Sequence, residues 1–168
     1  MQQDINSDPL LLELGRALYV FQAIEARIKV LLPHLTIPGT DETPYDEGWN
    51  GRRKYLDSKE MLGNLVRLLQ ERISVDDPAT LEQEWRTMVQ CRNDVVHNFV
   101  LQEFARCATL EQLEQSIEYV RTRRVRALPL LQMLDTMLRG FLSALQLPPD
   151  FEGEFPVELP DWLSTSAA

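Results

Sequence analysis

Helix-start signals and an apolar three-four spacing run through this chain and restrict it to an all-α fold. Asp8-Pro9 and Asp77-Pro78 each place a capping residue before a proline, which suits the first turn of a helix. Two capping-box patterns stand elsewhere, at Asp57/Glu60 and Thr109/Gln112. No segment shows the alternation typical of a strand. The sequence therefore predicts an antiparallel bundle of four to five helices.

Two of the predicted helices carry a charged residue on the apolar row. On the first helix Glu25 falls in the row that consists of Leu11, Leu14, Leu18, Phe21, Ile28, Leu32 and Leu35. On the third helix Arg92 falls in the row that consists of Leu81, Trp85, Met88, Val95 or Val96, and Phe99. Burying an unpaired guanidinium costs several kcal/mol. We therefore expect either an ion pair between Arg92 and Glu25 or a cleft that Arg92 shares with another subunit.

Prolines and acidic stretches divide the rest of the chain. Pro33 is expected to end or kink the first helix, and Pro129 to bend or break the fourth, with a fifth segment or a continuation beyond it. Residues 1–146 are predicted to form the helical bundle. Residues 147–168 are predicted to form a Pro-rich acidic tail that is extended or disordered.

The formal charge of −9 is concentrated in two places. Residues 41–47 carry four acids and 145–168 carry five, with no base in either stretch, so the remaining helical body has a formal charge of zero. No segment approaches the roughly 18 apolar residues of a membrane span, and the acidic start does not resemble a signal peptide. The two cysteines have no metal-ligand spacing. We expect a cytoplasmic protein with reduced, packed thiols.

The hexad Arg92-Asn93-Asp94-Val95-Val96-His97 carries the chemistry. An arginine can hold a phosphate bidentately, and a histidine can move a proton near neutral pH. Asn93 shares a helix face with His97 and is placed to fix the imidazole tautomer or to contact a ligand. A structural interpretation remains open, in which Arg92 only pairs with Glu25 and His97 is a surface residue. No glycine-rich phosphate loop, dinucleotide pattern or zinc spacing is present, so no cofactor is predicted.

This stretch, continued to Phe99, resembles the R-x4-6-H signature of HEPN-domain proteins, and the helical layout of residues 8–146 is similar to that family. The resemblance implies a metal-independent endoribonuclease or a degenerate relative, often in toxin–antitoxin or antiviral defence. It further implies Arg92 and His97 as catalytic pair, Asn93 as supporting residue, and a homodimer through helix 78–102 that joins two motifs in one cleft. Members controlled by nucleotidyl transfer have a tyrosine where this chain has Phe99, which puts that mode of control in doubt.

Two basic clusters are candidates for holding the RNA backbone. They consist of Arg121, Arg123, Arg124 and Arg126, and of Arg52, Arg53 and Lys54. A solvated helix end and a basic loop are the alternatives, and Arg124 also falls close to the apolar row. Two other functions stay open. One is a non-catalytic module that binds RNA, a nucleotide or a partner protein such as an antitoxin. The other is a regulator whose acidic tail occupies a basic groove.

Overall fold

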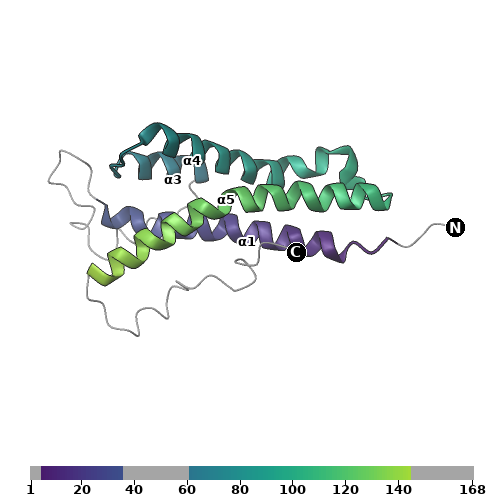
Figure 1. Ribbon diagram of the computed structural model, residues 1–168, viewed down its shortest axis with the longest axis horizontal. Coiled ribbons are helices and arrows are strands. Elements are labelled where there is room, and N and C mark those ends of the chain that lie inside the picture. Colours follow the sequence, from purple (N-terminus) through teal and green to yellow (C-terminus); the bar gives the residue numbers. More distant parts are fainter. Residues whose placement is uncertain (1–4, 36–60, 145–168) are drawn as a thin grey trace.

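The computed structural model describes residues 5–35 and 61–144, and all regular structure within these ranges is helical. Figure 1 shows the four long helices. They are α1 (Asp8–Leu31), α3 (Leu62–Gln70), α4 (Pro78–Asn93) and α5 (Leu110–Ala144). A 3₁₀ turn (Leu32–His34) follows α1. A π-helical segment (Asp94–Asn98) and two 3₁₀ turns (Phe99–Leu101 and Glu103–Arg106) follow α4. The predicted all-α bundle is confirmed.

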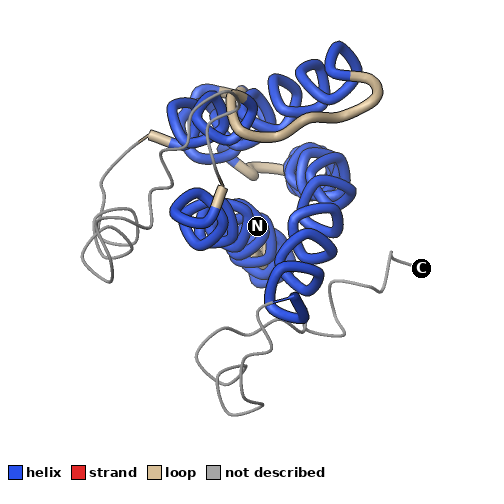
Figure 2. Tube along the Cα trace, turned by 90° about the vertical axis from the view of Figure 1, so that its left-hand side faces the viewer, coloured by secondary structure: helices blue, strands red, loops and turns tan. Residues whose placement is uncertain are grey.

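The bundle is built around α5, which packs along α1 and also contacts α4. In Figure 1, α4 runs opposite to both α1 and α5, so α1 and α5 run in the same direction. Viewed nearly end-on in Figure 2, α1, α5 and the α3–α4 layer surround a common core. Within the described helices no stretch has the length and apolar character required to cross a membrane.

The predicted helix starts are close to the observed ones. Asp77 caps α4, since its Oδ1 accepts a hydrogen bond from the Thr80 amide at 3.0 Å. Hydrogen bonding with the Thr80 side chain, and then with its amide, lowers the pKa of Asp77. Thr109 caps α5 in the same way. α1 begins one residue earlier than predicted, because Ser7 is the N-cap and the Asn6 side chain accepts from the Asp8 amide. Three other predictions concern residues outside the described ranges. They are the capping box at Asp57 and Glu60, the end of the bundle at 146/147, and the two acidic stretches.

The predicted apolar row of α1 is displaced by one residue in its first half. Leu11 and Leu18 are 62% and 41% exposed, whereas Leu10 and Ala17 are buried. Apolar residues at 10–12, 14 and 17–18 make two rows equally plausible from spacing alone. The buried charge of Glu13 distinguishes them, because Glu13 faces α5 and forms an ion pair with Arg124 there.

The predicted apolar row of α4 is wrong at position 92. Cys91 rather than Arg92 continues the buried row of α4, and Val95 and Phe99 extend it. Trp85 and Met88 are fully buried as predicted. Arg92 is half-buried at the side of this row, where it lines a pocket.

Pro129 lies inside α5, which bends midway in Figure 1 and continues to its end. A proline within a helix removes one backbone hydrogen bond and clashes with the preceding turn, so a bend is the expected result. The structure thus shows a continuation of the fourth predicted helix rather than a separate fifth one. The bend keeps the second half of α5 against α1, where Asp135 forms a buried ion pair with Arg27.

The two thiols are predicted to react at very different rates. Cys91 is buried between α4 and α5, and burial raises the pKa of its thiol, so little reactive thiolate forms at neutral pH. Cys107 is half-buried in the turn before α5. With a disulfide reagent at pH 8, we expect one thiol to react promptly in native protein and the second only on unfolding. Prompt reaction of both thiols, with peptide mapping to Cys91, would contradict the packing described.

Candidate functional site

A change of helix type brings Arg92 and His97 together. In an α-helix, residues five positions apart are separated by about 140° around the axis. Here α4 passes into a π-helical turn at Asp94, and the wider π turn brings residues five apart closer together around the axis. Arg92 Nη1 consequently lies 2.6 Å from His97 Nε2. The four-residue spacer of the motif matches this local geometry.

The polarity of this contact is fixed by the guanidinium, which can only donate. Nε2 of His97 must therefore be the acceptor, so the proton of the neutral imidazole is on Nδ1. Arg92 Nη1 also donates to Asn93 Oδ1 at 3.1 Å. Asn93 thus contacts the arginine of the motif and not the histidine. The sequence had suggested that Asn93 could fix the tautomer of the imidazole, and the structure shows no hydrogen bond between the two described side chains. Both hydrogens of Nη1 have acceptors, and within the described chain Nε and Nη2 of Arg92 have none.

The motif opens into a pocket of about 850 Å³ between α4 and the start of α3. Arg92, Asn93 and His97 line one side, and Gly63 and Asn64 of α3 line the other. His97 is exposed, whereas Arg92 and Asn93 are half-buried. The pocket is broad and open to solvent, which suits a large ligand better than an enclosed small molecule.

The predicted ion pair between Arg92 and Glu25 is not found among the described residues. Glu25 lines the same pocket, but its Oε1 pairs with Lys29 one turn further along α1, at 2.8 Å. Ile24, which is fully buried, occupies the apolar row at this turn of α1, and Glu25 lies beside the row. Glu25 therefore remains a residue of the pocket wall without the partner that the sequence predicted for it.

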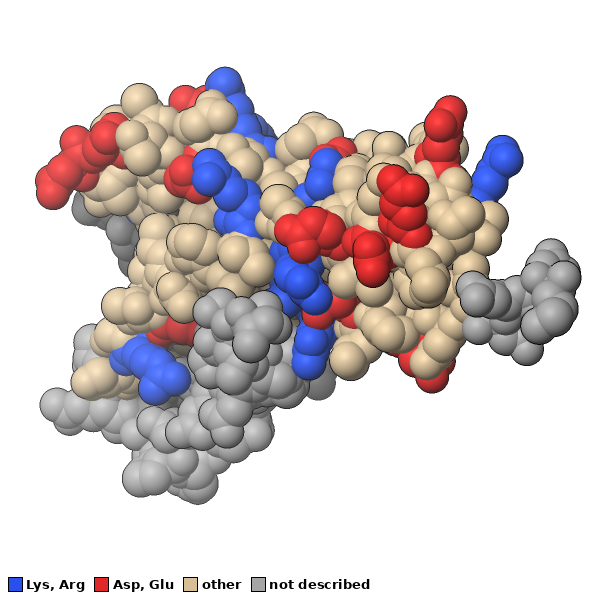
Figure 3. Space-filling model, turned by 45° about the vertical axis from the view of Figure 1, so that its right-hand side comes forward, with Lys and Arg blue, Asp and Glu red and all other residues tan. Residues whose placement is uncertain are grey.

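Three exposed or half-buried arginines of α5 form ion pairs with carboxylates. Arg123 pairs with Asp94, Arg126 with Glu84, and Arg121 with Glu118 on α5 itself. On the face drawn in Figure 3, basic and acidic side chains are interleaved and do not form a patch of one sign. These three arginines line a second hollow of about 800 Å³ between α4 and α5, as do their three acidic partners.

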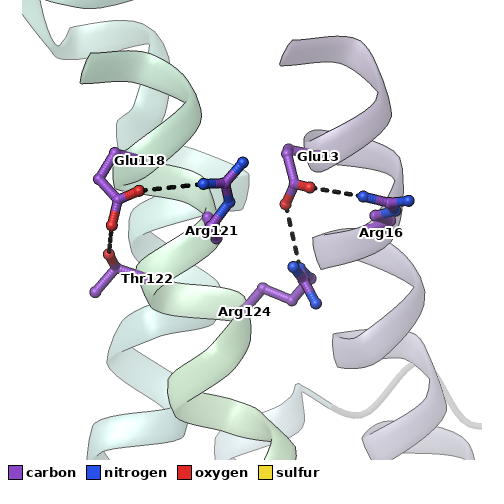
Figure 4. Close-up of polar contacts among 6 residues, drawn as sticks. All are labelled: Glu13, Arg16, Glu118, Arg121, Thr122 and Arg124. Atoms are coloured by element: carbon purple, nitrogen blue, oxygen red, sulfur yellow. Dashed lines mark hydrogen bonds and ion pairs between the residues drawn. The ribbon is translucent and has the colours of Figure 1, made fainter. Parts of the chain in front are cut away.

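Arg124 is not available to RNA, and its prediction as a backbone contact is corrected. Its side chain is 3% exposed and reaches from α5 to α1, where Nε donates to Glu13 Oε2 at 3.3 Å. Figure 4 shows Glu13 between Arg124 and Arg16, with Arg121 and Glu118 on the neighbouring turn of α5. Arg124 therefore joins two helices of the core. Arg52, Arg53 and Lys54 lie outside the described residues.

Sequence reasoning missed the pair formed by Asp94 and Arg123. Asp94 is inside the motif, but its spacing gave no reason to assign it a partner 29 residues away on another helix. The run of arginines on α5 could have indicated such a pair, because an arginine on the side of α5 that faces α4 can reach an acidic residue there. Within the described part of the chain, no group of three or more His, Cys, Asp and Glu side chains is placed to hold a metal ion.

Comparison of the chain with models of known protein families, with curated proteins and with solved structures found no match in any of the three.

Proposed function

We propose that this protein is a metal-independent endoribonuclease of the HEPN type, acting as a toxin or defence effector. The contact between Arg92 and His97 supports the proposal most strongly, since it joins a phosphate-binding group to a proton-transferring group at the mouth of an open pocket. Among the described residues, none accepts from the Nε and Nη2 edge of Arg92, which is a bidentate donor of the kind that matches two phosphate oxygens.

The reaction would use the ribose 2′-hydroxyl as nucleophile. Arg92 holds the non-bridging oxygens of the scissile phosphate as negative charge grows on them. Once a phosphate oxygen replaces His97 as acceptor of Arg92 Nη1, Nε2 of His97 is free to take the 2′-hydroxyl proton. The bond from phosphorus to the 5′-oxygen then breaks, and a protonated histidine supplies the proton to that leaving oxygen. The products are a 2′,3′-cyclic phosphate and a 5′-hydroxyl.

The reaction uses one histidine as the base and a protonated histidine as the acid. Two histidines perform these steps better than one, which supports a homodimer through helix 78–102. Val96, Val100 and Leu101 are 39%, 78% and 75% exposed and lie close in sequence to His97 and Asn98, which line the pocket. A second copy placed on this surface would bring its own His97 toward the same phosphate.

A dimer on this surface is predicted to be sensitive to a single charge. Val100→Asp is expected to convert a dimer into a monomer, because a carboxylate would be desolvated at the contact. Sedimentation at several protein concentrations measures the change. Leu110→Asp, at an exposed apolar site before the body of α5, is the matched control and should leave the dimer intact. A wild type that stays monomeric at all concentrations would contradict the dimer.

Cleavage of RNA by the purified protein in the presence of EDTA tests the proposed activity. Wild type should fragment RNA, and an Arg92→Ala/His97→Ala double variant of equal helicity should not. Induced expression in cells gives a parallel result, with growth arrest expected for the wild type alone. Equal cleavage by both proteins, or cleavage that requires added magnesium, would overturn the proposal.

A non-catalytic module that binds RNA, a nucleotide or a partner protein is the second candidate. One observation favours it: the arginines at positions 121, 123 and 126 all pair with carboxylates, so this described part of α5 offers little free basic surface for the RNA backbone. This candidate predicts binding of phosphate-containing ligands that depends on Arg92, together with intact RNA after prolonged incubation.

A further inference from the structure

We propose that Asp94 and Arg123 are positioning residues, which hold the π turn and thereby set the contact between Arg92 and His97. The catalytic importance of this contact rests on the proposed function, whereas the positioning role can be tested without it. Asp94 is the first residue of the π turn and lies between the two residues of the motif. Arg123 reaches it from α5, a helix that contributes no residue to the pocket of the motif.

Asp94 accepts hydrogen bonds from three directions. Oδ2 accepts from Arg123 Nε at 3.0 Å. Oδ1 accepts from Gln90 Nε2 at 2.7 Å, one turn before, and more weakly from Asn98 Nδ2 at 3.5 Å, at the end of the π turn. One carboxylate therefore ties the last α turn, both ends of the π turn and α5 together. Gln90 and Asn98 also line the pocket, so Asp94 contacts its wall from behind.

Arg123 is itself fixed in position. Its Nη1 donates to the backbone carbonyl of Tyr119 at 3.1 Å, and its guanidinium carbon lies 3.3 Å from the centre of the Tyr119 ring. That ring packs against Phe99 and Phe104, with centroid distances of 6.2 and 5.2 Å. The side chains of Asp94 and Arg123 are 19% and 24% exposed, so solvent weakens their attraction less than at an open surface.

A π turn is rare and occurs mostly as a single turn inside an α-helix, often at a functional site. Since the α form is the usual one, contacts such as these are expected to hold the π turn in place. Without the pair, residues 94–98 are expected to return to α geometry, in which residues 92 and 97 are about 140° apart. Arg92 would then lose His97 as an acceptor. The imidazole would no longer be held with its proton on Nδ1.

Nuclear magnetic resonance of protein with ¹⁵N-labelled histidine tests this directly. The chain has two histidines, and a His97→Gln variant assigns the signals. At a pH where the ring is neutral, wild-type His97 should show an unprotonated Nε2 and a protonated Nδ1. Asp94→Asn and Arg123→Gln should each shift His97 toward a mixture of tautomers. Asp94→Ala should do so more completely, with far-ultraviolet circular dichroism confirming that the variants are folded.

Glu84→Gln is the matched control, because it removes the ion pair between Glu84 of α4 and Arg126 of α5. This pair lies more than two helical turns before the motif. It should leave the His97 tautomer as in wild type. A wild-type tautomer in Asp94→Ala and Arg123→Gln, or the same shift in Glu84→Gln, would overturn the proposal. RNA cleavage is a separate measurement: if the tautomer shifts as expected and wild type cuts no RNA, the proposed function fails and the positioning role stands.

Discussion

Replacing Glu13 with alanine is expected to lower the free energy of unfolding by about 3–5 kcal/mol. Glu13 is 4% exposed and lies between Arg124 of α5 and Arg16 of its own helix. Arg124 Nη1 is buried and has no hydrogen-bond partner in the part of the chain that the structure describes, so removal of the carboxylate would leave a buried guanidinium without a described counter-charge. Urea denaturation followed by circular dichroism measures the loss.

The two partners of this buried pair should not be equivalent. Arg124→Met removes the buried cation and leaves Glu13 paired with Arg16 at 2.9 Å, so we expect a smaller loss than for Glu13→Ala. The double variant Glu13→Leu/Arg124→Met should recover most of the stability, because a buried ion pair can often be replaced by apolar side chains of similar volume. Glu82→Gln, which breaks an exposed pair with Arg86, is the control and should cost less than about 1 kcal/mol. Equal losses for Glu13→Ala and Glu82→Gln would contradict the description of the α1–α5 interface.

Replacing His97 with alanine is expected to reduce the rate of RNA cleavage by about 10²–10⁴-fold, the usual contribution of a residue that transfers protons. His97 is exposed and no carboxylate of the described chain contacts it. Its removal should therefore change the free energy of unfolding by no more than about 0.5 kcal/mol. Separate measurements of cleavage rate and thermal unfolding on the same preparation distinguish a chemical role from a structural one.

Arg92→Lys is the informative companion variant. Lysine keeps the charge and can donate hydrogen bonds but has no planar fork, so bidentate binding of a phosphate is lost. We expect most of the cleavage to be lost. Arg86→Lys, on the same helix and paired with Glu82 at the surface, should cleave as wild type does. Wild-type rates in Arg92→Lys would show that no bidentate contact is made at this position.

Sequence patterns predicted the helices well, because their starts are encoded locally. A capping residue before a proline or three residues before a glutamine needs no information from the rest of the chain. Which row of a helix is buried is not local. On α1, spacing alone allowed the row of Leu11 and Leu18 as well as that of Leu10 and Ala17. In the structure Leu10, Glu13 and Ala17 face inward, and Glu13 pairs there with Arg124 of α5.

The motif was visible in sequence, but its geometry was not. After Met88, helical spacing allows either position 91 or position 92 on the core row. The structure buries Cys91, with Val95 and Phe99 beyond it, and leaves Arg92 at the side of the row. The ion pair predicted with Glu25 followed from placing Glu25 and Arg92 on the buried rows, where the structure has Ile24 and Cys91. Likewise, a run of arginines on α5 indicated a free basic surface, whereas the acids that neutralise three of them come from α1, α4 and the π turn, far away in sequence.

The chemical nature of the RNA ends is the most direct test of the central claim, that Arg92 and His97 act together on a phosphodiester. Wild-type protein in EDTA, given RNA and the same RNA with 2′-O-methyl groups throughout, should cut the first and leave the second intact. Mass spectrometry of the fragments should show 2′,3′-cyclic phosphate and 5′-hydroxyl ends. Cutting of the methylated RNA, or fragments with 5′-phosphate ends, would contradict the account.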